Sequence, residues 1–380
     1  MSAVGLHTVL DKFPLPDGRA VIEGRSARRD LYPVTIVDDL PSAVNAVCGM
    51  LTHASIALVT DDGVGAIYAE QTEQLFRERN VSVVVKSIPP GEGSKTVPMA
   101  LELMDWLAQS LLSRRDVVVS LGGGVVIDTA GWVASAYMRG IPYINMPTTL
   151  LADVDAALGG KVAVDHPTAK NLIGAFYQPL GVVTNVGFLA TLDDRHLRAG
   201  LSEAVKKGII ASPALFEFIE TRLDDILGKS PTVLRELVRA SSAIKCRLIE
   251  RDPYEEDLRR PLNFGHTVGH ALETTTGYGP VLHGEAVSFG MSVAARIAQA
   301  RGLVDARTSG RIQELLRRAD LPTHLSDLAV TVDVELLVES MVKVRLIRDG
   351  HLRFVLPLAL GETAIVDGVT DSEIREAVST

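Results

Sequence analysis

Short apolar runs and amphipathic stretches alternate along the first half of the chain. The runs SIALVT (55–60), VSVVVKSI (81–88) and DVVVSLGGG (116–124) are rich in β-branched residues and bounded by turn-forming residues, which is typical of strands. Helical periodicity follows each run, as at 97–111, and PYINMP (142–147) has a strand pattern again. Because strands that alternate with helices pair in parallel, this pattern predicts a doubly wound α/β sheet.

Helical patterns dominate after about residue 185. The periodicity predicts helices at 195–210, 213–227, 231–250, 264–276, 283–301, 307–319 and 334–342. LRFVLPLAL (352–360) predicts a late strand or hairpin, and residues 1–30 an arm or extra strand. A chain of 380 residues is longer than most single domains. We therefore expect an α/β nucleotide-binding domain at 1–185, a mainly α-helical metal- and substrate-binding domain at 186–380, and a site between them.

Composition and charge narrow the range of partners. The formal net charge of −9 does not favour a nucleic acid or an anionic membrane, so an anionic small-molecule substrate needs a local cluster of Lys, Arg and His. The N-terminal segment lacks the long apolar stretch of a signal peptide, and the sequence has no membrane-spanning run, so we expect a cytoplasmic protein. Cys48 and Cys246 lie far apart and do not suggest a disulfide framework.

The segment SLGGGVVID (120–128) is the first candidate site. Glycines between a strand and a helix let the backbone approach a pyrophosphate, and the helix N-terminus offers free N–H groups and a favourable dipole. The motif is not the standard G-x-G-x-x-G, and a tight turn that needs glycine for its backbone angles is the alternative interpretation. The neighbouring segments PGEGSK (90–95) and PTTLL (147–151), together with Asp61 at a strand end, favour a nucleotide.

Histidines form the second candidate site. His266 and His270 are spaced i, i+4 and therefore share a helix face, and His283 follows a Gly/Pro turn that can bring it back to that face. Three imidazoles, or two with a carboxylate, make a catalytic site for a divalent cation such as zinc. Two helical histidines alone are as often core or surface residues, but three of the nine histidines fall within this short stretch and favour ligands.

A dense set of charged residues between positions 153 and 207 is the third. It contains Asp153, Asp155, Lys161, Lys170, Asn171, Glu203, Lys206 and Lys207. Glu203 and Lys206 share a helix face, as a metal carboxylate and a phosphate-binding cation would. Solvated surface pairs are the alternative, but small and apolar neighbours such as Gly159, Gly160 and Ile173 favour a lined pocket.

Several of these segments, in this order, resemble the dehydroquinate synthase family of sugar phosphate cyclases. They are SLGGGVVIDTAGWVASAYMRG, PTTLLADVDAALGGK, KNLIGAFYQP, LSEAVKKG, LRRPLNFGHTVGHALE and LHGEAVSFGM. The similarity extends from about Tyr32 to Gly361, nearly the whole chain. The resemblance implies an NAD-dependent and metal-dependent lyase, a homodimer, whose NAD lies between the two domains.

The resemblance also assigns residues to roles. A single zinc or cobalt ion is expected on Glu203, His266 and His283. The substrate pocket is expected to contain Arg139, Asp155, Lys161, Asn171, Lys206, Lys245, Arg259, Asn263 and His270. The NAD contacts are expected to be Asp61, Glu92, Lys95, Gly123, Gly124, Asp128, Thr148, Thr149, Lys170 and Thr191. In the implied reaction a substrate alcohol is oxidised, phosphate leaves by β-elimination, the ketone is reduced again and the ring closes by aldol addition.

Two departures from the family pattern stand out, and the second bears on the substrate. Ile127 replaces a glycine, and Val344-Arg345-Leu346 stands where dehydroquinate synthases carry Asp-Lys-Lys, so Arg345 replaces the pocket lysine. This change favours sedoheptulose 7-phosphate, the substrate of 2-epi-valiolone-type synthases in secondary metabolism. Arg259 and Asn263 are retained and favour the carboxylated substrate of 3-dehydroquinate synthase, which is the alternative. A metal-dependent glycerol-type dehydrogenase and a non-catalytic relative are more remote alternatives.

Overall fold

The computed structural model describes residues 31–380 except 53–54, 168, 255–259 and 348–351. The expected N-terminal arm at 1–30 lies outside the described residues, as does the expected pocket residue Arg259. Arg345 lies on a described helix, but its side chain is outside the description.

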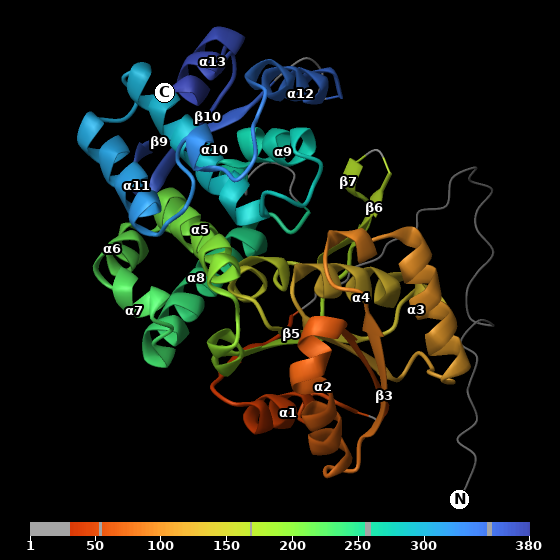
Figure 1. The fold of residues 1–380 in the computed structure, drawn as a ribbon. Helices are drawn as coiled ribbons and strands as arrows, with labels where there is room; N and C mark the ends of the chain where they lie inside the picture. The colour runs from red at the N-terminus through yellow and green to blue at the C-terminus, as the bar shows by residue number, and fades with distance from the viewer. Residues whose placement is uncertain (1–30, 53–54, 168, 255–259, 348–351) are drawn as a thin grey trace, which may run out of the picture. The chain divides into compact units, whose positions relative to one another are not determined.

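A six-stranded parallel sheet forms the first half of the molecule. Its strands are β1 (Val34–Val37), β2 (Ser55–Asp61), β3 (Ser82–Ile88), β4 (Val117–Gly122), β5 (Tyr143–Pro147) and β8 (Gly181–Asn185). They lie in the order β1-β8-β5-β4-β2-β3, and every pairing between them is parallel. The prediction of a doubly wound sheet is therefore confirmed (Figure 1).

Helices cover both faces of this sheet. They are α1 (Leu40–Cys48), α2 (Asp62–Arg77), α3 (Val97–Gln109) and α4 (Gly124–Ala136). Successive side chains of a strand point to opposite faces, so Ile56 and Leu58 of β2 pack with α1 and α2. Ala57 and Val59 pack with α3 and α4. Burial on both faces explains why these strands have continuous apolar runs rather than an alternating pattern.

A hairpin and several single turns complete this half. The hairpin is β6 (Lys161–His166) with β7 (Ala169–Phe176), paired antiparallel, and the sequence patterns did not predict it. The π-helical turn η4 (Ala152–Ala156) carries Asp155. The 3₁₀ turns are η2 (Glu92–Ser94), η3 (Tyr137–Arg139) and η5 (Val186–Ala190).

Helices dominate after residue 190, as the periodicity predicts. They are α5 (Asp194–Ala211), α6 (Pro213–Thr221), α7 (Leu223–Leu227), α8 (Pro231–Arg251), α9 (His266–Thr275), α10 (His283–Ala300), α11 (Ala306–Arg318), α12 (Val334–Ile347) and α13 (Asp371–Ser379). The remaining elements are the hairpin β9 (Phe354–Ala359) and β10 (Glu362–Val366), with the turns η6 (Arg260–Asn263) and η7 (Leu325–Asp327). The prediction of a single helix at 213–227 is wrong, because the backbone leaves helical geometry at Arg222.

The helix α10 is the centre of this half. Nearly all its side chains are buried, and it packs against α5, α9 and β9 in one large apolar core. A helix that is buried on all sides holds the side chains of its first turn against the neighbouring elements. No helix among the described residues is long and apolar enough to span a membrane. The last strand of the sheet ends at Asn185, and a domain boundary between residues 185 and 186 stays a prediction.

Candidate metal and nucleotide site

Three helices bring Glu203, His266 and His283 together. Glu203 comes from the middle of α5, and the two histidines are the first residues of α9 and α10. The Nε2 atoms of His266 and His283 each lie 3.7 Å from Oε1 of Glu203. One donor atom from each of the three side chains lies within 4.8 Å of the others. Such a set can surround one cation, since zinc binds nitrogen and oxygen ligands at about 2.0–2.2 Å.

Glycines at two helix crossings permit this arrangement. A Cβ on Gly284, the residue after His283, would lie 1.9 Å from the carbonyl oxygen of Ala199 on α5. A Cβ on Gly290 would lie 1.9 Å from the carbonyl oxygen of Gly265, whose φ of +79° precedes the start of α9 at His266. The backbones of α5, α9 and α10 therefore touch directly, which fixes the starts of α9 and α10 relative to Glu203.

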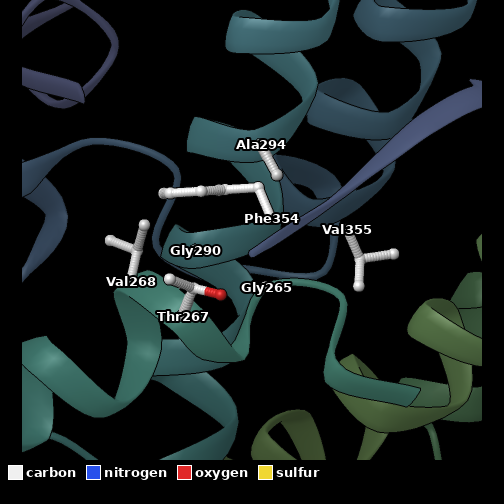
Figure 2. Close-up of a pocket in the computed structure, with 7 residues that line it drawn as sticks. All are labelled: Gly265, Thr267, Val268, Gly290, Ala294, Phe354 and Val355. Atoms are coloured by element: carbon white, nitrogen blue, oxygen red, sulfur yellow. The ribbon is translucent and has the colours of Figure 1, made fainter. Parts of the chain in front are cut away.

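A narrow crevice marks the crossing of α9, α10 and β9 (Figure 2). It is lined mainly by apolar groups, including Val268, Gly290, Ala294 and Phe354, and the space between them, about 160 Å³, is partly open to solvent. None of this space is wide enough to hold a water molecule. The crevice is a packing seam beside the histidine cluster and offers no polar group suited to chemistry beyond the hydroxyl of Thr267.

The buried carboxylate of Glu203 has no hydrogen-bond partner on either oxygen among the described residues. It is fully buried, and Nζ of Lys206 lies 2.5 Å from Oε2 as an ion pair. Lys206 offsets part of the cost of burying this charge, but Oε1 keeps open lone pairs, which are costly when buried unless a cation coordinates them. Burial and the charge of Lys206 lower the pKa of His266 well below its ordinary value, so its imidazole is neutral, the form that binds metals.

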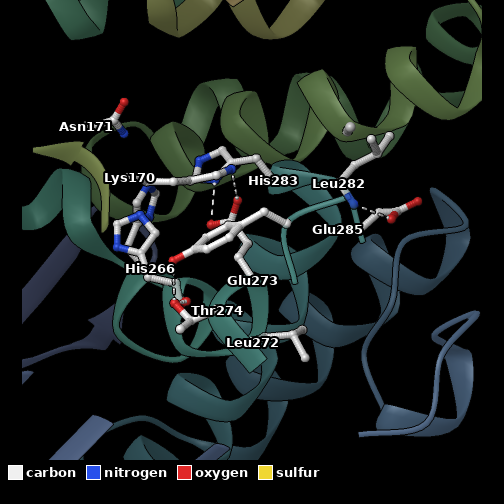
Figure 3. Close-up of polar contacts among 12 residues, drawn as sticks. Lys170, Asn171, His266, Leu272, Glu273, Thr274, Leu282, His283 and Glu285 are labelled. Carbon is white, nitrogen blue, oxygen red and sulfur yellow. Dashed lines mark hydrogen bonds and ion pairs between the residues drawn. The ribbon is translucent and has the colours of Figure 1, made fainter. Parts of the chain in front are cut away.

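His283 is held from its other ring nitrogen. Its Nδ1 lies 3.2 Å from Oε2 of Glu273, near the end of α9 (Figure 3). Its Nε2 is the atom that lies 3.7 Å from Oε1 of Glu203. Burial lowers the pKa of His283, but the hydrogen bond and charge of Glu273 outweigh it and raise the value. The second oxygen of Glu273 lies 3.3 Å from Nζ of Lys170 on β7. His270 is exposed beside the other two rings, with centroids 5.1 Å from His266 and 5.9 Å from His283.

A second charged cluster surrounds Asp155. Its Oδ1 lies 3.0 Å from Nζ of Lys245 on α8 and 3.3 Å from Nζ of Lys207 on α5. Lys245 also donates to the carbonyl oxygen of Asp155 at 2.6 Å. Although burial opposes ionisation, Lys245, Lys207 and Lys206 hold the pKa of Asp155 well below its usual value. Burial lowers the pKa of Lys207 to about 8, against the charge of Asp155.

The expected nucleotide contacts gather around Lys95. Its Nζ lies 2.6 Å from Asp128 and 2.5 Å from the amide oxygen of Asn171, with Glu92 at 4.0 Å. Glu92 also lies 3.4 Å from Nζ of Lys170. These side chains lie near the start of α4, where Gly123 is the N-cap and no side chain caps the free N–H groups. The first turn of α4 is thus open to an anion, as the glycine loop predicts.

Models of one enzyme family match most of the chain. The model of the 3-dehydroquinate synthase N-terminal domain matches residues 85–199, and the model of its C-terminal domain matches residues 200–345. The chain belongs to the 3-dehydroquinate synthase family. The family resemblance that the motifs predict is therefore confirmed.

Individual members of the family are similar over nearly the whole chain. A 2-epi-valiolone synthase from Actinosynnema mirum is 50% identical over 98% of this chain and 97% of its own length. A 3-dehydroquinate synthase from Desulforamulus reducens is 42% identical over 85% of this chain and 89% of its own. The solved structure of 2-epi-5-epi-valiolone synthase from Streptomyces hygroscopicus subsp. jinggangensis 5008, with NAD⁺ and Zn²⁺ bound, superposes with a TM-score of 0.87. It is 28% identical and covers 94% of this chain and 98% of that one.

The remaining candidates drawn from the family lie in different places. Asp61 is the N-cap of α2 and accepts from the backbone N–H groups of Gly63 and Val64 at 2.9 Å. The hydroxyl of Thr148 is buried without a partner in the described chain, whereas Thr149 accepts from the N–H of Ala152. Thr191 shares a hydrogen bond of 2.7 Å with Tyr68.

The structure does not bring every pocket candidate to the clusters. Arg139 is exposed beyond the C-terminal end of α4, about 18 Å along the helix from the glycine loop. Lys161 opens β6 on its exposed side, and Asn263 ends η6, three residues before His266.

Two central residues have no assigned role in the sequence prediction. His266, His270 and Glu273 are spaced i, i+4 and i+7, so all three share one face of the helix. This spacing could have identified Glu273 as a member of the histidine cluster. Lys207 follows Lys206 directly, and sequence alone does not reveal that it is fully buried against Asp155.

Proposed function

We propose that this chain is a sugar phosphate cyclase of the 2-epi-valiolone synthase type. It converts sedoheptulose 7-phosphate to a carbocycle with elimination of phosphate, and it uses NAD and one divalent cation, zinc or cobalt. The observation that carries the proposal is the buried Glu203 carboxylate with two histidines aimed at the same oxygen. The similarity to the Actinosynnema mirum enzyme supports this member of the family.

The chemistry of the donor set fits a divalent cation. One carboxylate and two imidazoles form a three-ligand set of the kind that catalytic zinc sites use, which leaves a position for a substrate oxygen. Oε1 of Glu203, which has no hydrogen-bond partner among the described residues, and the neutral imidazole of His266 suit coordination of a cation. Glu203, His266 and His283 would hold the ion.

The glycine loop fits a dinucleotide. A Cβ on Gly123 would lie 3.1 Å from Cγ2 of Thr149, which is tighter than an ordinary contact, and the lack of a side chain there lets a pyrophosphate approach the backbone at the start of α4. The orphaned hydroxyl of Thr148 lies at the adjacent strand end, and Lys95 and Lys170 supply positive charge nearby. When bound, NAD would accept and return a hydride and the cation would polarise a substrate oxygen.

Residues of the chain then position the substrate. Asp155, held ionised between Lys245 and Lys207, offers an acceptor for a substrate hydroxyl. His270 is exposed beside the two histidine ligands, where a substrate oxygen can reach it. We propose that Lys206 and Lys245 contribute to the positive potential that attracts the phosphate, and that Lys161, Asn171, Asn263, Arg259 and Arg345 complete the pocket. A homodimer is likewise proposed, by family resemblance.

The substrate is tested by comparing the two seven-carbon phosphates directly. Purified protein with NAD and zinc or cobalt is supplied with sedoheptulose 7-phosphate or with the carboxylated heptulosonate phosphate, and phosphate release and product mass are measured. We expect kcat/KM to favour sedoheptulose 7-phosphate, because this ratio defines discrimination. If the carboxylated substrate wins by tenfold or more, about 1.4 kcal/mol in barrier height, the alternative of a 3-dehydroquinate synthase holds.

Two controls separate the proposal from a dehydrogenase. Treatment with a chelator should abolish turnover, and zinc or cobalt should restore it. NAD should be required without stoichiometric accumulation of NADH, because the proposed reaction returns the hydride. Steady production of NADH from glycerol-like alcohols would contradict the proposal.

A further inference from the structure

Glu273 joins the candidate metal site to the nucleotide side of the molecule. It lies near the end of α9 with its side chain only 4% exposed, and it contacts one partner 10 residues away and another 103 residues away. Oε2 lies 3.2 Å from Nδ1 of His283, and Oε1 lies 3.3 Å from Nζ of Lys170 (Figure 3). A buried carboxylate with two separate partners has its geometry determined by both.

The contact with His283 determines which ring nitrogen faces Glu203. A carboxylate that accepts from Nδ1–H fixes the proton on that atom and leaves the lone pair on Nε2. Nε2 is the atom 3.7 Å from Oε1 of Glu203. By contrast, Nδ1 of His266 lies 3.2 Å from the carbonyl oxygen of Phe264, a neutral acceptor. The negative charge that orients a histidine of this cluster therefore acts on His283.

Lys170 competes with His283 for the carboxylate of Glu273. Nζ of Lys170 lies 3.4 Å from Glu92 as well as 3.3 Å from Glu273, and it stands 4.7 Å above the ring of Tyr278. While Lys170 neutralises part of the charge of Glu273, less of that charge acts on His283. A nucleotide that draws Lys170 toward its own anionic groups releases Glu273 to act on His283 alone.

We propose that Glu273 is a positioning residue that orients His283 for the metal and, through Lys170, makes metal binding tighter when the nucleotide is bound. The inference rests on the proposed function, which supplies the metal and the nucleotide. Carboxylates that orient a metal-bound histidine typically change metal affinity by about 10–100-fold. Coupling between two sites is reciprocal, so the metal must tighten nucleotide binding by the same factor.

The test measures Co²⁺ affinity by competition with a chromogenic chelator, together with the visible absorption spectrum of the bound Co²⁺. In nucleotide-free protein, Glu273→Gln should raise the Kd for Co²⁺ by about 10–100-fold and alter the spectrum. Lys170→Met should lower the Kd, because it leaves the carboxylate to His283. Lys170 is on a partly exposed hairpin, so this variant tests the proposal even if Glu273→Gln does not fold.

The nucleotide supplies the second measurement. Saturating NAD should lower the Kd for Co²⁺ by about fivefold or more in the unmodified protein, and should leave it unchanged in Glu273→Gln. Glu220→Gln is the matched control, because Glu220 on α6 pairs with Arg311 on α11, neither is a candidate ligand, and the variant should behave as unmodified protein.

Distinct results separate the inference from the proposed function. If the unmodified protein binds Co²⁺ tightly and Glu273→Gln binds it with the same Kd and spectrum, the inference is overturned and the proposed function stands. An unchanged or raised Kd in Lys170→Met would also overturn it. If the unmodified protein binds no divalent cation, the proposed function fails and the inference fails with it.

Discussion

A substitution where α10 crosses α5 can test whether the candidate metal site depends on helix packing. Gly284 follows His283 at the start of α10, and Ala199 lies one turn before Glu203 on α5. A methyl group on Gly284 would lie 1.9 Å from the carbonyl oxygen of Ala199. The substitution Gly284→Ala therefore pushes apart the two helices that carry His283 and Glu203.

The structure sets the size of the effect. Carbon atoms are stable in contact at about 3.5 Å, so the helices must separate by more than about 1 Å at this point. Overpacking a buried contact costs about 1–3 kcal/mol, and we expect about 3 kcal/mol because a backbone oxygen cannot rotate away. A displacement of this size is large beside a metal–ligand bond of about 2.0–2.2 Å. We expect the Kd for the metal to rise and kcat to fall by about 100-fold each.

The assay compares Gly284→Ala with Gly310→Ala. Gly310 lies on the exposed side of α11, and a methyl group there meets nothing within 4 Å. Alanine in a helix is up to about 1 kcal/mol more favourable than glycine, so Gly310→Ala should keep or slightly raise stability and retain full metal affinity. Stability is measured by urea unfolding and metal affinity by chelator competition. Gly284→Ala with unchanged metal affinity would refute the claim that this contact sets the distance between Glu203 and His283.

Two further predictions concern the charged residues of α5. Glu203→Gln should weaken the binding of Co²⁺ by more than about 100-fold in a chelator competition, because it removes the anionic ligand; a smaller loss would exclude Glu203 as a ligand. Burial lowers the pKa of Lys207 to about 8 in the folded protein, against an ordinary value of 10.5. Because the unfolded chain then binds this proton more tightly than the folded protein, the free energy of unfolding rises as pH increases through 8. Relative to Lys207→Met, the unmodified protein should gain about 1 kcal/mol of unfolding free energy between pH 8 and pH 9, and a gain of zero would contradict this burial.

The sheet could be predicted because its signals are local. Strands buried on both faces produce continuous β-branched runs, and the glycine loop must follow a strand if it is to open a helix. The hairpin β6–β7 gave no such signal, because its strands contain Gly174 and end at partly exposed positions. The break between α6 and α7 was also missed, since Arg222 is a residue with a high helix propensity and the surrounding packing overrides it.

The candidate metal ligands could be predicted only in part from spacing. His266 and His270 share a helix face by periodicity, whereas the approach of His283 and Glu203 depends on helix crossings that no local pattern describes. The turn before His283 and the spacing of Glu203 and Lys206 made both residues candidates, and the family resemblance selected them as the expected ligands, because a matched motif carries information about tertiary contacts that a single helix does not.

Lys207 and Glu273 make interactions that can be identified only from the three-dimensional structure. Adjacent residues on a helix point about 100° apart, so Lys206 and Lys207 ought to face different surroundings, one buried and one solvated. Both are buried, because α5 is enclosed by η4 and α8 on one side and α10 on another.

Lys206 pairs with Glu203 and Lys207 with Asp155, so α5 supplies a cation to each of two carboxylates that belong to separate clusters. Glu273 performs a similar function on α9 with opposite charge, since one carboxylate serves both His283 and Lys170. The pairings of Lys207 with Asp155 and of Glu273 with Lys170 join residues 52 and 103 positions apart, and only the closure of those long loops by the fold makes them neighbours.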